Sequence, residues 1–252
     1  MRATARTGFA DREPVLPPLA LADMIAGLYG ANAVTTALLA RERSIARGQV
    51  IDVSLLEAMF SVLGPEAAIF RHTGKVRGRI GSASDTSAPR NVYRCADGHY
   101  VALSASMQTM AKRVFEVIGR PDMIEDPRFR TNSDRIRNRD AVNAIVGAWF
   151  AGKTRDEALA IVRAADVTVG PVYDIADAVA DRHFREREIL VEVEDADIGT
   201  LPMHNIVPRL SVTPGRWRRP APRLGEHTDA ILAEAGYDAG AIAALRRAGA
   251  AT

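Results

Sequence analysis

The sequence has a single cysteine, Cys95, which therefore has no partner for an intrachain disulfide. One thiol agrees with a reducing compartment. No apolar run approaches the roughly 20 residues that a membrane helix requires, and no apolar segment of a signal peptide precedes Asp11. Together these absences predict a soluble, cytoplasmic protein without a membrane partner.

The motifs of several common enzyme classes are also missing. The chain has no Gly-x-Gly-x-x-Gly after a strand, no phosphate-binding loop that ends in Gly-Lys-Ser/Thr, and no Gly-x-Ser-x-Gly. The histidines lack metal-ligand spacing among themselves and with the cysteine; they are His72, His99, His183, His204 and His227. We therefore expect no metal site and no permanently bound cofactor.

A strong charge of either sign is absent as well. The formal net charge is +2, and this small excess predicts no nucleic-acid partner. The arginines nevertheless gather in three places, at 77–79, 128–139 and 216–219. A solvated basic face explains such clusters, and an anionic partner such as a phosphate-bearing cofactor is the alternative.

What is present is organised around the stretch from Pro17 to Gly27, which places Asp23 in the first turn of a helix predicted to run to about Ala46. Pro17 and Pro18 end the preceding segment because proline fixes its own backbone angle. Asp23 is either a helix cap or dipole partner, or a catalytic carboxylate that the helix end keeps ionised. On these residues alone the cap is favoured.

The remaining pattern predicts a mixed α/β chain in which helices predominate. We expect Gly48 to end the long helix, 50–53 to form a strand, and Ser54 to open a helix over 55–63 through a capping box. The glycine- and serine-rich residues 73–89 predict a long loop at a domain boundary.

After that loop, an Asp-Gly turn predicts a hairpin of strands 92–95 and 100–103. Helix caps are predicted at Ser106, Thr154 and Thr228. Periodicity predicts helices at 106–118, 132–150, 154–164, 172–181, 228–235 and 239–248, and strands at 167–169, 189–193 and 201–210.

Six segments in a fixed order carry more information than any one of them. They are Leu-Ala-Asp-Met-Ile-Ala-Gly at 21–27, then 37–41, 47–58, 88–93 with 96–98, 169–172 and 222–228. This set resembles the family III CoA-transferases (CaiB/BaiF), the group that contains formyl-CoA:oxalate CoA-transferase. The resemblance covers nearly the whole chain.

The resemblance implies an α/β fold, namely the C-terminal portion of the family fold with part of a Rossmann-like large domain and a small α/β domain. Most of the family's N-terminal half has no counterpart in this sequence. Four parts are implied: the nucleophile-bearing helical part of the large domain at 1–72, a crossing loop at 73–89, the small α/β domain at 90–182, and a return segment with the C-terminal helices of the large domain at 183–252.

In that family the acid at the head of an Asp-x-x-x-Gly helix is the catalytic nucleophile, which matches Asp23 and Gly27 here. The resemblance implies a CoA-transferase that moves CoA between an acyl-CoA thioester and a small carboxylic acid through an aspartyl covalent intermediate. The CoA thioester is a substrate, and no CoA-binding residue is assigned. A homodimer, or a heteromer with a chain that carries the N-terminal half, is the implied assembly. Residues 81–87 match the family's glycine-rich loop but contain one glycine.

Two alternatives remain open. A 2-methylacyl-CoA racemase-like enzyme of the same superfamily uses an acid/base pair with a histidine upstream of the aspartate, and no histidine precedes Asp23. A catalytically silent fragment or structural subunit is the other, in which the small-residue helix packs against a partner chain.

Overall fold

The computed structural model describes residues 6–252 and divides the chain into two compact units, one that ends at Val172 and one at Tyr173–Thr252. This division falls inside the predicted small domain at 90–182, and the four-part division stays a prediction. Within the described residues no helix has both the length and the apolar character needed to cross a membrane.

The first unit contains a three-stranded antiparallel sheet in the order β1-β2-β3. Strands β1 (Arg90–Arg94) and β2 (Tyr100–Ser104) form the predicted hairpin around the Asp-Gly turn. Strand β3 (Val169–Pro171) starts two residues later than predicted and includes the glycine and proline that were expected to stop it. Proline is tolerated there because β3 is an edge strand, which leaves one side of its backbone unpaired.

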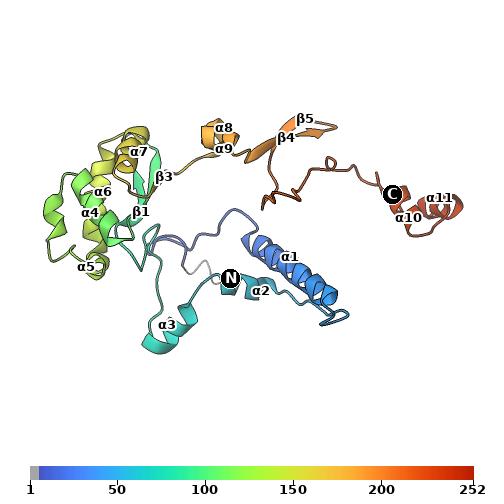
Figure 1. Cartoon of the computed structure of the whole chain (residues 1–252), viewed down its shortest axis with the longest axis horizontal. Coiled ribbons are helices and arrows are strands. Elements are labelled where there is room, and N and C mark those ends of the chain that lie inside the picture. Colours follow the sequence, from blue (N-terminus) through green and yellow to red (C-terminus); the bar gives the residue numbers. More distant parts are fainter. Residues whose placement is uncertain (1–5) are drawn as a thin grey trace. The chain divides into compact units, whose positions relative to one another are not determined.

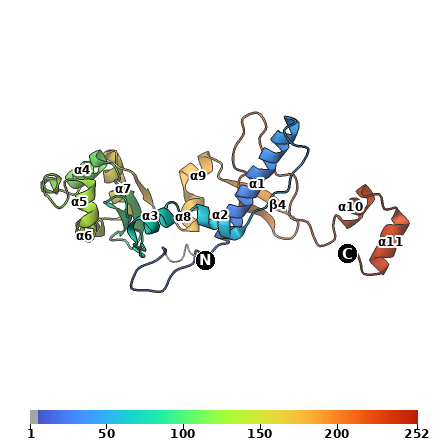
Figure 2. The ribbon, with the colours of Figure 1, turned by 90° about the horizontal axis from the view of Figure 1, so that it is seen from below.

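Four helices pack beside this sheet and enclose the main hydrophobic core, which extends from Ala88 to Val167. Figures 1 and 2 show them gathered in the green-to-yellow part of the ribbon. The Tyr93 ring of β1 stacks on Phe150 at a centroid distance of 5.1 Å, and Trp149 meets Phe150 edge-on. The helices are α4 (Gln108–Val117), α5 (Asn132–Arg137), α6 (Arg139–Ala151) and α7 (Arg155–Ala164), with a 3₁₀ turn, η2, at Pro121–Ile124.

The helix starts test the predicted caps. Thr154 forms the predicted capping box with Glu157 at the start of α7. Ser106 is wrong as a cap, because the residue before α4 is Met107 and no side chain caps that helix. The single helix predicted over 132–150 is two helices, because the Asn138 amide donates to the carbonyls of Arg128 and Asp134 and interrupts the turn.

A buried arginine ties the core to the loop that precedes β1. The Arg135 guanidinium of α5 is fully buried and donates to the carbonyl of Ala88, the carbonyl of Phe129 and the side chain of Gln108. Desolvation lowers the pKa of Arg135. Asn132 adds a hydrogen bond of 2.9 Å from its amide to the Thr86 carbonyl. The end of the 74–89 loop is therefore fixed by side chains of α5.

The first unit also contains three helices outside this core: α1 (Leu21–Glu42), α2 (Leu55–Ser61) and α3 (Glu66–Thr73). Helices α1 and α2 lie side by side, and the Tyr29 hydroxyl meets the Ser61 hydroxyl at 2.9 Å. The predicted strand at 50–53 is wrong, since those residues pair with no strand among the described residues and Val50 is 95% exposed.

Three further expectations for this region are corrected. Ser54 precedes α2 but its side chain makes no capping hydrogen bond. Helix α1 ends four residues before the predicted end, and Ser44 rather than Gly48 takes the left-handed conformation beyond it, with φ 55°. The predicted loop at 73–89 is otherwise confirmed, since no helix or strand occurs from Gly74 to Pro89.

The second unit consists of short elements. The two predicted strands are confirmed as β4 (Leu190–Asp195) and β5 (Gly199–His204), which form an antiparallel hairpin, but β5 ends six residues earlier than predicted. Thr228 is the first residue of its helix and not its cap, which is a correction. The helices of this unit are α8 (Ile175–Ala180), α9 (Arg182–Glu186), α10 (Thr228–Glu234) and α11 (Ala239–Arg247).

We expect Arg135→Leu to lower the free energy of unfolding of the first unit by about 3 kcal/mol, because the buried carbonyls of Ala88 and Phe129 and the Gln108 side chain lose their donor. Urea unfolding followed by tryptophan fluorescence measures this, in a Trp217→Phe background where Trp149 of the core is the sole reporter. Arg137→Leu on the same helix is the control, since Arg137 is exposed and its pair with Asp134 contributes at most about 1 kcal/mol. Equal losses in the two variants contradict the role of Arg135.

Candidate functional site at the start of α1

Asp23 is the third residue of α1, and the chain reaches this helix through two tight turns. The amide of Leu19 donates to the Pro17 carbonyl, and the amide of Leu21 donates to the Leu19 carbonyl, each at 2.8 Å. The residue at the N-cap is Ala20, which has no side chain that can accept a hydrogen bond from the first turn. The interpretation of Asp23 as the helix cap is therefore wrong.

The Asp23 carboxylate is exposed, and among residues 6–252 it makes no hydrogen bond or ion pair. A helix N-terminus carries a partial positive charge from its unpaired amides, which attracts a negatively charged group that lies in or near the first turn. An aspartate with a structural role normally uses its carboxylate oxygens to accept hydrogen bonds from neighbouring groups. Asp23 keeps both oxygens available to an incoming group.

The glycines of α1 leave open space along the same helix. A Cβ atom built on Gly27, one turn after Asp23, has no neighbour within 4 Å, and the same holds for Gly30. Packing inside the described chain therefore does not require either glycine. The space is open to another backbone or to a ligand, which agrees with the sequence prediction for this helix.

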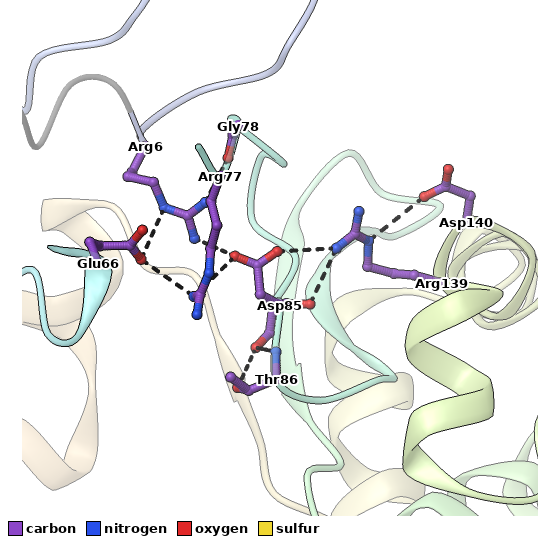
Figure 3. A network of polar contacts seen from close by, with 9 residues as sticks. Arg6, Glu66, Arg77, Gly78, Asp85, Thr86, Arg139 and Asp140 are labelled. Carbon is purple, nitrogen blue, oxygen red and sulfur yellow. Dashed lines mark hydrogen bonds and ion pairs between the residues drawn. The ribbon is translucent and has the colours of Figure 1, made fainter. Parts of the chain in front are cut away.

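A second polar cluster surrounds Asp85 in the 74–89 loop (Figure 3). Its carboxylate is hydrogen-bonded by Arg6 and lies 3.6 Å from a nitrogen of Arg77 and 3.6 Å from a nitrogen of Arg139. Glu66 of α3 forms ion pairs with Arg6 and Arg77, at 3.7 and 3.3 Å. Sequence reasoning found Arg77 and the 128–139 run as basic clusters but missed both acids, because no local spacing connects them.

Two other kinds of site, a metal site and a reactive cysteine, find little support among the described residues. The described residues contain no group of three or more His, Cys, Asp or Glu side chains placed to hold a metal ion. Burial raises the pKa of the Cys95 thiol, which keeps it protonated and unreactive. Asp23 thus remains the candidate nucleophile, and its role stays a prediction.

Comparisons with known proteins agree on one family. The family model described as CoA-transferase family III matches residues 3–228. The alpha subunit of a succinyl-CoA–L-malate CoA-transferase from Chloroflexus aurantiacus is 37% identical over 90% of this chain, and the beta subunit is also 37% identical over 90%. A crystal structure of a CaiB/BaiF family protein from Brucella suis aligns with a TM-score of 0.74 at 31% identity over 92% of this chain.

The match covers only part of each relative. The chain spans 53% of the alpha subunit, 56% of the beta subunit and 60% of the Brucella suis chain. It therefore corresponds to a little over half the length of the proteins it resembles.

We expect Asp23→Ala to change the stability of the first unit by less than about 1 kcal/mol, since only the helix dipole interaction is lost. Thr154→Ala in the same unit removes a true cap and serves as the matched control, with an expected loss of about 1 kcal/mol. Thermal unfolding followed by far-ultraviolet circular dichroism compares the two. A larger loss for Asp23→Ala than for Thr154→Ala would show that the carboxylate has a structural role.

Proposed function

This chain belongs to CoA-transferase family III, and we propose that it carries the nucleophile of an enzyme that moves CoA between an acyl-CoA thioester and a carboxylic acid. The observation that carries the proposal is the uncommitted Asp23 carboxylate at the start of α1, in a chain that matches the family over residues 3–228. The relatives are named for transfer of CoA from succinyl-CoA, which favours transfer over racemisation. We place the reaction in the cytoplasm, as the single cysteine suggests.

In the proposed reaction a carboxylate oxygen of Asp23 attacks the thioester carbonyl carbon, the carbon–sulfur bond breaks, and CoA leaves as a thiolate. The product is a mixed acyl-aspartyl anhydride. The thiolate then attacks the aspartyl carbonyl, which releases the donor acid and leaves CoA as an aspartyl thioester. The acceptor carboxylate repeats both steps in reverse, which regenerates the carboxylate of Asp23 without any redox change.

The position of Asp23 suits this chemistry. The helix start carries a partial positive charge, and unpaired amides of the first turn can donate to an oxyanion as it forms. The open space at Gly27 and Gly30 lets a bulky thioester approach the helix. The covalent steps therefore rely on groups that lie within about two turns of Asp23 along α1.

We also propose that a second polypeptide chain completes the enzyme, as a homodimer or as a heteromer with a chain that supplies the rest of the fold. The chain corresponds to 53–60% of its relatives' length. Helix α1 has one buried residue, Ala26, and exposes large apolar side chains along its length; they are Met24, Leu28, Tyr29, Val34, Leu38 and Leu39. Water-exposed apolar surface of this extent favours association.

We expect Asp23→Asn to lower CoA transfer about a thousandfold or more, because an amide is a poor nucleophile. The assay supplies succinyl-CoA and L-malate to the chain in complex with a candidate chain for the missing half. In the unmodified complex, mass spectrometry of the peptide that contains Asp23 should find CoA attached as a thioester.

Glu42→Gln is the matched control, because Glu42 is an exposed acid at the other end of the same helix. Transfer should stay within about twofold in this variant, as expected for an exposed acid far from the reacting group. Undiminished transfer in Asp23→Asn, or CoA attached to a different residue, rules out Asp23 as the nucleophile.

We expect Leu28→Glu to weaken association with the completing chain at least tenfold, because a buried leucine contributes about 1.5–3 kcal/mol and a buried carboxylate costs more. Analytical ultracentrifugation measures the association constant. Ile198→Glu is the control, since Ile198 is 77% exposed and Leu28 is 73% exposed. If both variants associate as the unmodified chain does, α1 is not the contact surface.

A further inference from the structure

The arginine cluster consists of Arg6, Arg77 and Arg139 around the carboxylates of Glu66 and Asp85 (Figure 3). Asp85 alone contacts all three guanidinium groups, which come from the N-terminal segment, the 74–89 loop and α6. The side chains of both acids remain 24% exposed. The cluster is thus partly desolvated but still open to a ligand from solvent.

The cluster has more positive charge than its own acids neutralise. Three guanidinium groups face two carboxylates, and Asp140, which lies 3.9 Å from Arg139, is fully exposed and screened by water. Arg77 and Arg139 lie 3.3–3.6 Å from their carboxylate partners, whereas a charge-assisted hydrogen bond measures about 2.7–2.9 Å. Their donors are therefore held near carboxylates without the short bidentate bonds that a guanidinium can form.

A cavity of about 350 Å³ lies beside the cluster, lined by Arg6, Arg77, Arg90 and loop residues 80–86. Ligand pockets in proteins measure about 300–1,000 Å³, so this one is small. It has room for a short-chain acid but not for a complete CoA molecule. Arg90 brings a further positive charge to its wall.

We propose that the arginine cluster binds a carboxylate group of a small dicarboxylic acid, which takes the place of Asp85 on Arg77 and Arg139. The cluster already holds two carboxylates of its own side chains, so its geometry suits this class of anion. Asp85 then acts as a built-in competitor that occupies the site when no acid is bound. The binding of this acid does not depend on the proposed function. Only its role as a substrate of CoA transfer rests on that function.

Isothermal titration calorimetry with succinate and the full chain tests the site without any assay of activity. We expect Arg77→Gln to weaken succinate binding tenfold or more, because a charged hydrogen-bond donor is lost. Arg90→Gln should weaken it as well; Arg90 lines the cavity outside the ion-pair network, so this variant keeps the network intact. Arg163→Gln, which removes an exposed charge from α7, is the control and should leave binding unchanged.

Asp85→Asn gives the sharpest outcome, because removal of the built-in competitor should strengthen succinate binding. A purely structural Asp85 predicts unchanged or weaker binding in this variant, and that result overturns the proposal. Circular dichroism spectra of every variant confirm that differences in affinity do not come from loss of folding.

Two further ligands distinguish the source of the anion. The binding of butyrate, which has one carboxylate, should depend less on the arginine cluster than the binding of succinate does. If adenosine 3′,5′-bisphosphate rather than succinate depends on Arg77, the cluster binds phosphate and the proposal is wrong. Absence of succinate binding to the unmodified chain also overturns it.

The two proposals fail in different ways. If the Arg77→Gln complex transfers CoA with an unchanged KM for the acceptor acid, the anion site is wrong and the proposed function stands. If the chain binds succinate through Arg77 and Arg90 but transfers no CoA in any complex, the proposed function is wrong and the anion site stands.

Discussion

The apolar core between Ala88 and Val167 is the constraint from which the three-stranded sheet and helices α4–α7 take their geometry. Its packing holds the three-stranded sheet against α4–α7, and the buried Arg135 extends this order to the backbone of the preceding loop. The loop end is thereby fixed, and so is the position of Asp85 relative to Arg139 at the start of α6. A polar cluster on the surface is thus positioned by hydrophobic packing beneath it.

Local signals predicted the parts of the fold that depend on few neighbours. The Asp-Gly hairpin and the Thr154 capping box each need residues at most fourteen positions apart, and both formed as predicted. The strand at 50–53 failed because a strand requires a partner that a short apolar run does not reveal. The break at Asn138 was missed because one of its two acceptors, the Arg128 carbonyl, lies outside the helix.

In the candidate site, too, local signals predicted only the features that depend on few neighbours. The position of Asp23 at a helix start could be predicted from the prolines and the apolar period, but its proposed role came from the order of six segments rather than from local chemistry. The structure added that Ala20 occupies the cap and that the Asp23 oxygens are uncommitted. Glu66 and Asp85 could not be found from the sequence, because the arginines that join them are far apart along the chain.

That separation has a consequence for the order in which the molecule assembles. The contact between Arg6 and Asp85 spans 79 residues, and Arg139 lies further along, whereas β1 and β2 meet across a short turn. Closing a long loop costs more chain entropy than closing a short one, so we expect the hairpin to form before the arginine cluster. The complete cluster also requires Arg139, the first residue of α6. Its three arginines therefore join segments that are far apart in the sequence, namely the N-terminal segment, the 74–89 loop and α6.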